Sequence, residues 1–246
     1  WACRQRNIIL VVCGSATSWM LNNVIRDYGG LYSRLTLKIQ LHPFSLGECE
    51  QYYCQRHFLF SRYEIALAYM VLGGIPYYMD MLRNDETLSR NIDRIFFSNH
   101  SIKQEFEDVY VGLFQSSEKY LDIVTTLGNH RYGMTRNEIA QTLGMTSGGG
   151  LSTMLDNLEQ SGIVSTYPRR GKNRKETIYR LVDFFSLFYL KNVLHAHPSG
   201  TNWMKMQRSP QFFSWAGISF EILVAQHLRH LQEALRIGNV TGCSCW

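Results

Sequence analysis

The spacing of hydrophobic residues changes along the chain and predicts different secondary structure in successive segments. Residues 8–13 form a continuous apolar run rich in Ile and Val, which is typical of a strand covered on both faces. Residues 35–41 alternate apolar and polar side chains, which predicts a half-covered or edge strand. The pattern of residues 18–28, between them, fits a short helix. We therefore expect residues 1–46 to form the end part of an α/β sheet.

Residues 47–115 carry apolar side chains at helical spacing. The pattern predicts helices over 47–58, 61–72, 76–82, 91–97 and 102–114. Pro76 suits the first turn of the third helix, because its missing N–H would have no partner there. Two glycines before this helix mark a tight joint.

Residues 116–182 show the clearest pattern. Helices are predicted over 118–128, 137–143 and 151–160, and Thr135 with Glu138 has the spacing of a capping box before the second. After Gly162 the spacing changes to two residues on either side of a basic stretch, which predicts a hairpin. Three helices followed by a hairpin are the elements of a winged helix-turn-helix.

Residues 183–246 predict an aromatic-rich helix over 184–194, a polar linker around 197–207 and a helix over 219–235. The expected fold class is mainly α with a partial α/β sheet. The 246 residues are 45% hydrophobic and 18% charged, which is ordinary for a globular protein. The apolar runs are too short to cross a membrane, so no membrane partner is predicted. Scattered cysteines and the lack of a signal-peptide pattern predict a cytoplasmic protein.

The positive charge of the chain, +5 in total, has a local centre in the predicted hairpin. Residues 169–175 contain no acidic residue, so they create a local field that attracts a polyanion. We predict that DNA phosphates are contacted by Arg169, Arg170, Lys172, Arg174 and Lys175. Ser152 and Asn157 on the helix over 151–160 would face the groove, but this face has few basic residues, which predicts weak base reading. The alternative is a structural spacer with a solvated tip.

Three stretches precede the predicted winged helix in order: ILVVCGSATSW, LYSRLTLKIQLHPFS and GGIPYY. Together they resemble the prokaryotic AAA/STAND-like ATPases (the archaeal-type ATPase family), which carry a winged helix after the ATPase lid and a C-terminal restriction-endonuclease-like domain. The resemblance covers nearly the whole chain. It implies four parts: a C-terminal remnant of the α/β ATPase core over 1–46, a helical lid over 47–115, a winged helix-turn-helix over 116–182, and a linker helix with the truncated start of the endonuclease-like domain over 183–246.

The chain contains no GxxxxGK[ST] sequence to wrap phosphates and no apolar strand ending in Asp-Glu to hold Mg²⁺. ATP and Mg²⁺ would therefore belong to the intact parent, and no cofactor is expected for this chain alone. We expect a fragment that lacks an N-terminal ATPase portion, couples nucleotide state to DNA or partner binding, and is able to form oligomers. The alternative is a winged-helix DNA-binding regulator or a protein-interaction module without ATPase activity.

The resemblance also implies roles for single residues. Ser15 would contact the γ-phosphate or the attacking water; on the residues alone it is part of a Gly-Ser turn. Arg34 would neutralise charge on a transferring phosphoryl group, or is an ordinary surface arginine. Ser33 stands where the family usually has a glycine, which changes the loop before Arg34. Gly74 and Pro76 would belong to the GxP element of the family, whose proline packs near the bound nucleotide base, although a helix start with Pro at its first position explains the residues adequately.

Glu221 resembles a glutamate near the start of the nuclease-like domain, where it can join a metal site. Two-metal hydrolysis needs several carboxylates, so Glu221 alone is expected to be a solvated residue of an amphipathic helix. His227 and His230, one helical turn apart, and the cysteines at 243 and 245 are residue types that suit zinc. Neither the histidine pair nor the cysteine pair is a strong metal-binding pattern, and no metal site is predicted.

Overall fold

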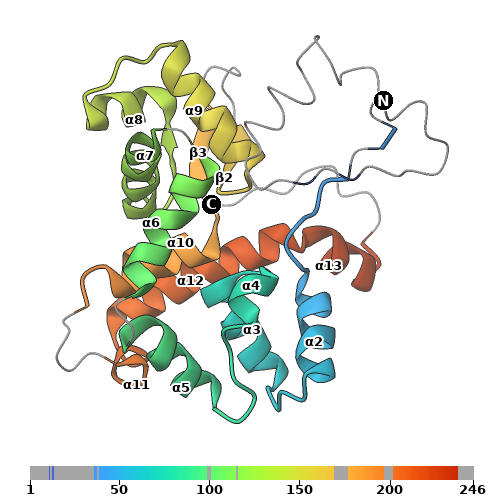
Figure 1. Ribbon diagram of the computed structural model, residues 1–246. Helices are drawn as coiled ribbons and strands as arrows, with labels where there is room; N and C mark the ends of the chain where they lie inside the picture. The colour runs from blue at the N-terminus through green and yellow to red at the C-terminus, as the bar shows by residue number, and fades with distance from the viewer. Residues whose placement is uncertain are drawn as a thin grey trace.

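The computed structural model describes residues 11, 13, 36, 37, 39–98, 101–114, 116–168, 177–196 and 202–237. These residues are mainly helical, and their strands form one three-stranded antiparallel sheet (Figure 1). The mainly α fold class is thereby confirmed. The predicted strand over 8–13 lies outside the described residues, apart from positions 11 and 13. Residues 39–41, in the second predicted strand, pair with no described strand, so the prediction of a strand there is wrong for this part.

The segment after residue 45 is helical, as the spacing predicted. Its elements are α2 (Leu46–Gln55), α3 (Arg62–Leu72), α4 (Pro76–Met79), α5 (Leu88–Ile92), the π-helical η3 (Asp93–Phe97) and α6 (Ser101–Leu113). Capping boxes begin α2 and α3: the side chains of Ser45 and Ser61 each accept from the N–H three residues on, where a glutamate accepts in return. Helix α4 begins with Pro76 as expected, but ends at Met79.

Residues 117–181 form a separate group of elements that we call the hairpin unit, at the upper left of Figure 1. It contains α7 (Ser117–Asn129), β1 (Met134–Thr135), α8 (Arg136–Leu143), α9 (Gly149–Gln160), β2 (Val164–Pro168) and β3 (Thr177–Leu181). The strand order is β1-β3-β2, with Tyr179 of the central strand paired to Met134 on one side and to Thr166 on the other. The predicted capping box of Thr135 and Glu138 is confirmed.

The C-terminal segment contains α10 (Phe184–Phe188), the π-helical η5 (Tyr189–Val193), α11 (Trp203–Met206), α12 (Pro210–Gln226) and α13 (Leu228–Ala234). The predicted helix over 184–194 corresponds to α10 and η5. The predicted helix over 219–235 is wrong in two respects, because α12 already begins at Pro210 and the helix breaks at His227. Part of the predicted linker is also helical, as α11.

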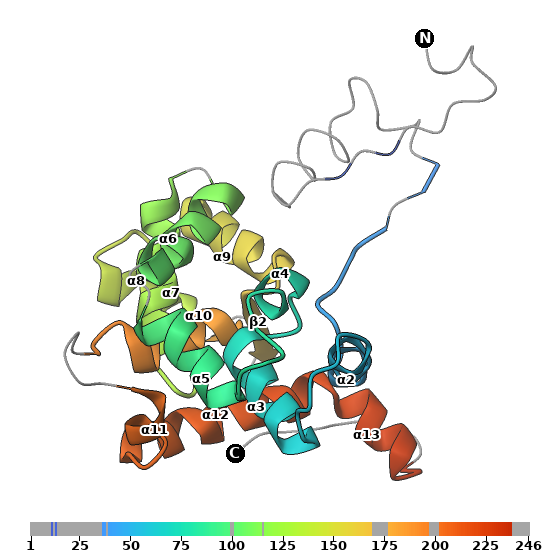
Figure 2. The ribbon, with the colours of Figure 1, turned by 60° about the horizontal axis from the view of Figure 1, so that its bottom comes forward.

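Helix α10 lies in the core and packs against both α3 and α12 (Figures 1 and 2). All of its residues are buried. The ring of Phe188 contacts Phe96, Trp203 and Trp215, with centroid distances of 4.7, 5.6 and 5.1 Å. Strand β3 leads directly into α10. This aromatic packing therefore fixes the hairpin unit to the remaining helices, α2–α6 and α10–α13, which we call the helical body. No helix within the described ranges is long and apolar enough to cross a bilayer.

Candidate nucleic-acid interface

The start of α9 is held at the surface by contacts from α8. Its inner face is buried through three leucines: Leu151, Leu155 and Leu158. Arg136, the first residue of α8, donates from Nη1 to Oγ of Ser152 at 2.8 Å. The hydroxyl of Ser147 donates to Oδ1 of Asn137 at 2.7 Å, which fixes the turn between the two helices. An exposed arginine is therefore placed against the first turns of α9.

The first turn of α9 is sterically open. Its N-cap is Gly148, and no described side chain caps the helix. A Cβ built at Gly149 or Gly150 would have no described atom within 4 Å. Backbone N–H groups at a helix start carry partial positive charge and favour anions. Together with Arg136, this end of α9 has the chemistry for a phosphate contact, and Ser152 lies within it.

The second half of α9 is unfavourable for a phosphate contact. The amide of Asn157, predicted to face DNA, donates from Nδ2 to the hydroxyl of Tyr120 at 2.8 Å and so attaches α9 to α7. Asp156 and Glu159 are exposed on the same half. Burial, and then these two carboxylates, raise the pKa of Tyr179 on the neighbouring strand β3. This half of the helix would repel a phosphate backbone.

The basic tip of the hairpin lies outside the described residues, and with it Arg169, Arg170, Lys172, Arg174 and Lys175. The strands on either side are described. Pro168 of β2 and Thr177 of β3 are the last paired residues, so both ends of the connection meet at the same end of the sheet. The contacts predicted for the five basic residues stay predictions.

Gly74, in the segment that the resemblance compares with the GxP element, is in close contact with the chain before α2. A Cβ at Gly74 would lie 2.0 Å from the carbonyl oxygen of Phe44. The Phe44 N–H donates to the Gly74 carbonyl at 2.7 Å. Because this backbone occupies the space over Gly74, the position has no room for a side chain, and the predicted nucleotide contact of the segment stays a prediction. Pro76 stands at the first turn of α4.

Glu221 has a specific partner rather than a solvated carboxylate. Arg180 of β3 donates from Nη2 to Glu221 Oε2 at 3.1 Å and from Nη1 to Oε1 at 3.4 Å. The guanidinium side chain is only 10% exposed, so the pair is largely removed from water. The expectation that Glu221 is simply solvated is therefore wrong: it joins the hairpin unit to α12.

The described residues contain no group of three or more His, Cys, Asp or Glu side chains that could hold a metal ion. The rings of His227 and His230 lie 5.9 Å apart, but both nitrogens of His227 have protein partners. Ser15 and Arg34 lie outside the described residues, so their predicted contacts with phosphate stay predictions.

A polar group is also buried where α10 begins. Asp183 is the N-cap of α10 and accepts from the Ser186 N–H at 2.8 Å. The Ser186 hydroxyl is 2.7 Å from the hydroxyl of the fully buried Tyr110. Burial raises the pKa of the Asp183 carboxyl above its ordinary value, against the hydrogen bonds from Ser186. This network joins α6 to α10 and is enclosed by the core, so we assign it a structural role.

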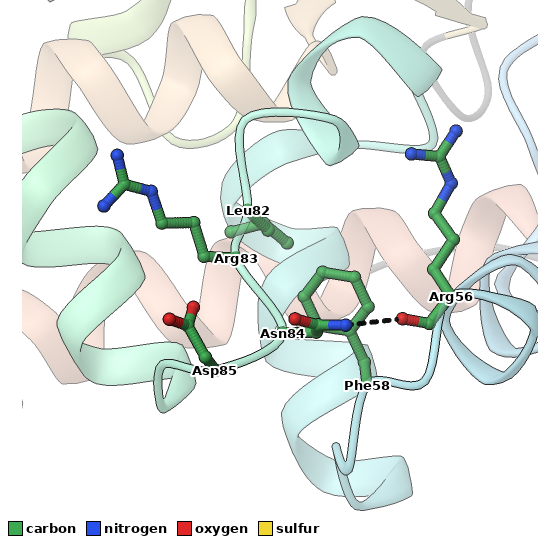
Figure 3. A pocket seen from close by; sticks show the side chains of 6 residues that line it. All are labelled: Arg56, Phe58, Leu82, Arg83, Asn84 and Asp85. Carbon is green, nitrogen blue, oxygen red and sulfur yellow. Dashed lines mark hydrogen bonds between the residues drawn. The ribbon is translucent and has the colours of Figure 1, made fainter.

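An open depression of about 550 Å³ lies between the ends of α2 and α4 (Figure 3). Asn84 donates to the carbonyl of Arg56 at 2.9 Å across it, beside Phe58. The guanidinium groups of Arg56 and Arg83 point to different sides in Figure 3, and each has an acidic partner, Asp80 and Glu86 respectively. The depression therefore presents no convergent set of polar groups.

Comparison with protein-family models, curated proteins and solved structures gives no match to this chain. The sequence pattern did not single out Arg136, which the structure places against α9. A local feature of the sequence could have indicated Arg136: it directly follows the capping residue Thr135, at the start of the helix that precedes α9.

Proposed function

We propose that the hairpin unit is a winged helix that binds duplex DNA through its phosphates, within a chain that forms the lid and winged-helix part of a AAA/STAND-like ATPase. The observation that carries the proposal is the order of elements: a helix, a short strand, two helices and a hairpin whose returning strand is central. In helix-turn-helix proteins the second helix of the pair, here α9, lies in the major groove.

The charges on α9 favour contact through its first turn only. Arg136 and the open backbone of Gly149 and Gly150 are attractive to a phosphate, whereas Asp156 and Glu159 oppose deeper entry. The basic hairpin tip would supply further phosphate contacts. Phosphate contacts carry no direct sequence information, so we expect affinity with little discrimination between sequences.

The ATPase part of the proposal is supported by the sequence resemblance alone. In the GGIPYY element, Pro76, which the resemblance places near the base, stands in the first turn of α4, and Gly74 lies against the Phe44 backbone. We therefore assign no step of ATP chemistry to the described residues. Purified chain is expected to show only background ATP turnover, and activity above background would contradict this reading.

The DNA proposal is tested by titrating the full chain with two duplexes of unrelated sequence and equal length, followed by fluorescence anisotropy. We expect similar affinities that fall with salt, with a log–log slope of about −0.9 for each phosphate neutralised. Arg136→Ala should weaken binding to both duplexes alike and reduce the slope by about 1. Arg62→Ala is the matched control, because Arg62 is also an exposed arginine near a helix start, paired with Glu50.

Three outcomes would contradict the proposal: no binding at low salt, strong preference for one duplex, or equal effects of the two substitutions. Equal effects would mean that the chain binds DNA through its overall charge rather than through α8 and α9.

A second candidate, a protein-interaction role, is favoured by the segment before α2. Leu37, Ile39 and Leu41 are 73%, 73% and 89% exposed, although their alternation is typical of a strand with one covered face. Such a segment is suited to pairing with a sheet edge, as an N-terminal ATPase portion would supply. Replacing the three residues by threonine should abolish such an association, measured by light scattering or pull-down with that portion, and leave DNA binding unchanged.

A further inference from the structure

The segment of residues 39–45, which we call the arm, leaves the start of α2 and runs away from the helices (Figure 2). Its base is held by three hydrogen bonds from three different parts of the chain. The Phe44 N–H donates to Gly74 O at 2.7 Å, and the hydroxyl of Tyr69 donates to Phe44 O at 2.9 Å. The Leu46 N–H, directly after the arm, donates to Nε2 of His227 at 2.9 Å.

His227 lies where α12 breaks and α13 begins. Its Nδ1 is 2.9 Å from the carbonyl oxygen of Leu223, which can only accept. Nδ1 must therefore carry a proton. Nε2 faces the Leu46 N–H, which can only donate, so Nε2 must be unprotonated. Only the neutral ring with its proton on Nδ1 satisfies both contacts.

We infer that His227 is a proton-operated latch, which ties the start of α2, at the base of the arm, to the α12–α13 junction while the ring is neutral and loosens this contact when the ring is protonated. A proton on Nε2 would place two donors against each other. The resulting cation would also face the positive end of the α2 dipole, since Leu46 is the first residue of α2. Both effects weaken the same contact, which joins segments 181 positions apart.

Two neutral acidic groups near the His227 ring, a hydroxyl and a thiol, keep their protons between about pH 5 and 8. On α3, burial raises the pKa of Tyr69, whose ring lies 5.4 Å from the imidazole, so its hydroxyl stays neutral. On α2, burial raises the pKa of Cys49 to about 12, and its thiol also stays protonated.

Glu48 and Arg229 are charged groups of the two helices that begin next to the latch, α2 and α13. Hydrogen bonds from Ser45 lower the pKa of Glu48, with a smaller contribution from His230, so Glu48 stays ionised. Its carboxylate is occupied by the N–H and hydroxyl of Ser45. On α13, Arg229 is paired with Glu233 at 3.1 Å on the exposed side. His230 is a second titratable ring, without the bond to Leu46, and therefore serves as the control.

The test is ¹⁵N NMR of the full chain between about pH 8 and pH 5, the range in which histidines change charge. At the upper pH the ¹⁵N shifts of His227 should show a protonated Nδ1 and an unprotonated Nε2. The protection factor of the Leu46 amide against hydrogen exchange should fall at least about tenfold as the His227 ring titrates, because opening of this contact becomes more frequent.

His227→Gln keeps an acceptor oxygen without a titratable ring, so its Leu46 protection should no longer fall with pH. His230→Gln should keep the wild-type fall. The wild-type spectrum tests the idea even where a variant does not fold. A proton on Nε2 at the upper pH, constant Leu46 protection, or the same fall in His227→Gln would each overturn the latch.

Discussion

Gly74→Ala tests whether the joint between the arm and the helical body is as tight as the structure describes. The alanine Cβ would lie 2.0 Å from the Phe44 carbonyl oxygen and 2.8 Å from its nitrogen, whereas real Cβ atoms essentially never approach within 3.0 Å. The two backbones would have to separate by roughly 1 Å. No rotation of a side chain can relieve this contact, because both neighbours are main-chain atoms.

The expected loss of stability follows from what that separation breaks. Two hydrogen bonds depend on the position of Phe44, from its own N–H to Gly74 and from the hydroxyl of Tyr69 to its carbonyl. At about 1 kcal/mol each, their loss alone predicts about 2 kcal/mol of destabilisation. Strain, if the segments stay together, would raise the total to about 4 kcal/mol.

Urea unfolding followed by circular dichroism measures this difference. Gly112→Ala is the matched control, because Gly112 lies within α6 and a Cβ there would have no described atom within 4 Å. Alanine should stabilise that helix by about 0.5 to 1 kcal/mol. A Gly74→Ala protein within about 0.5 kcal/mol of the wild type would refute the close-approach argument.

Two further substitutions test the buried polar contacts. The raised pKa of Asp183 means that its contribution to stability is present at low pH and is lost as the pH rises through the folded-state value. Asp183→Asn can still cap α10 and should remove this loss, measured by urea unfolding over a pH series; an unchanged pH profile would contradict it. Glu221→Ala should destabilise the chain by about 3 kcal/mol, because it leaves the guanidinium of Arg180 buried without its partner. A loss below about 1 kcal/mol in thermal or urea unfolding would mean that the pair is solvated.

The helices of residues 47–181 could be predicted because their signals are local. Apolar residues recur at helical spacing, and the capping box of Thr135 and Glu138 fixes the start of α8. The hairpin followed from the change to two-residue spacing. Strand β1 could not be predicted, since its two residues are too few to show a period and its pairing depends on β3.

Helix α12 was predicted too short because it is apolar on more than one face. Phe212 and Trp215 are buried, but Phe213 and Phe220 are 65% and 58% exposed, so no single hydrophobic stripe marks the helix. The better signal was at its start, where Ser209 caps the helix and Pro210 occupies the first turn.

The surroundings of the candidate site residues depend on contacts between segments that are distant in sequence. The spacing of apolar residues along the chain carries no information on such contacts. The pattern of α9 alone predicted that Asn157 faces solvent, but α7 crosses that side and Tyr120 accepts its hydrogen bond. The ion pair of Arg180 with Glu221 and the bond from Leu46 to His227 likewise join segments far apart in sequence. These pairings follow from the packing of α10 and α12 and could be found only in the folded structure.

The most direct test of the central claim, that the hairpin unit binds DNA, is an NMR titration of the ¹⁵N-labelled chain with a short duplex. DNA bound through the first turn of α9 should cause the largest shifts at the amides of Gly149, Gly150 and Ser152 and at the Arg136 side chain, with little change at Arg62. Shifts confined to the helical body, or none at low salt, would contradict it.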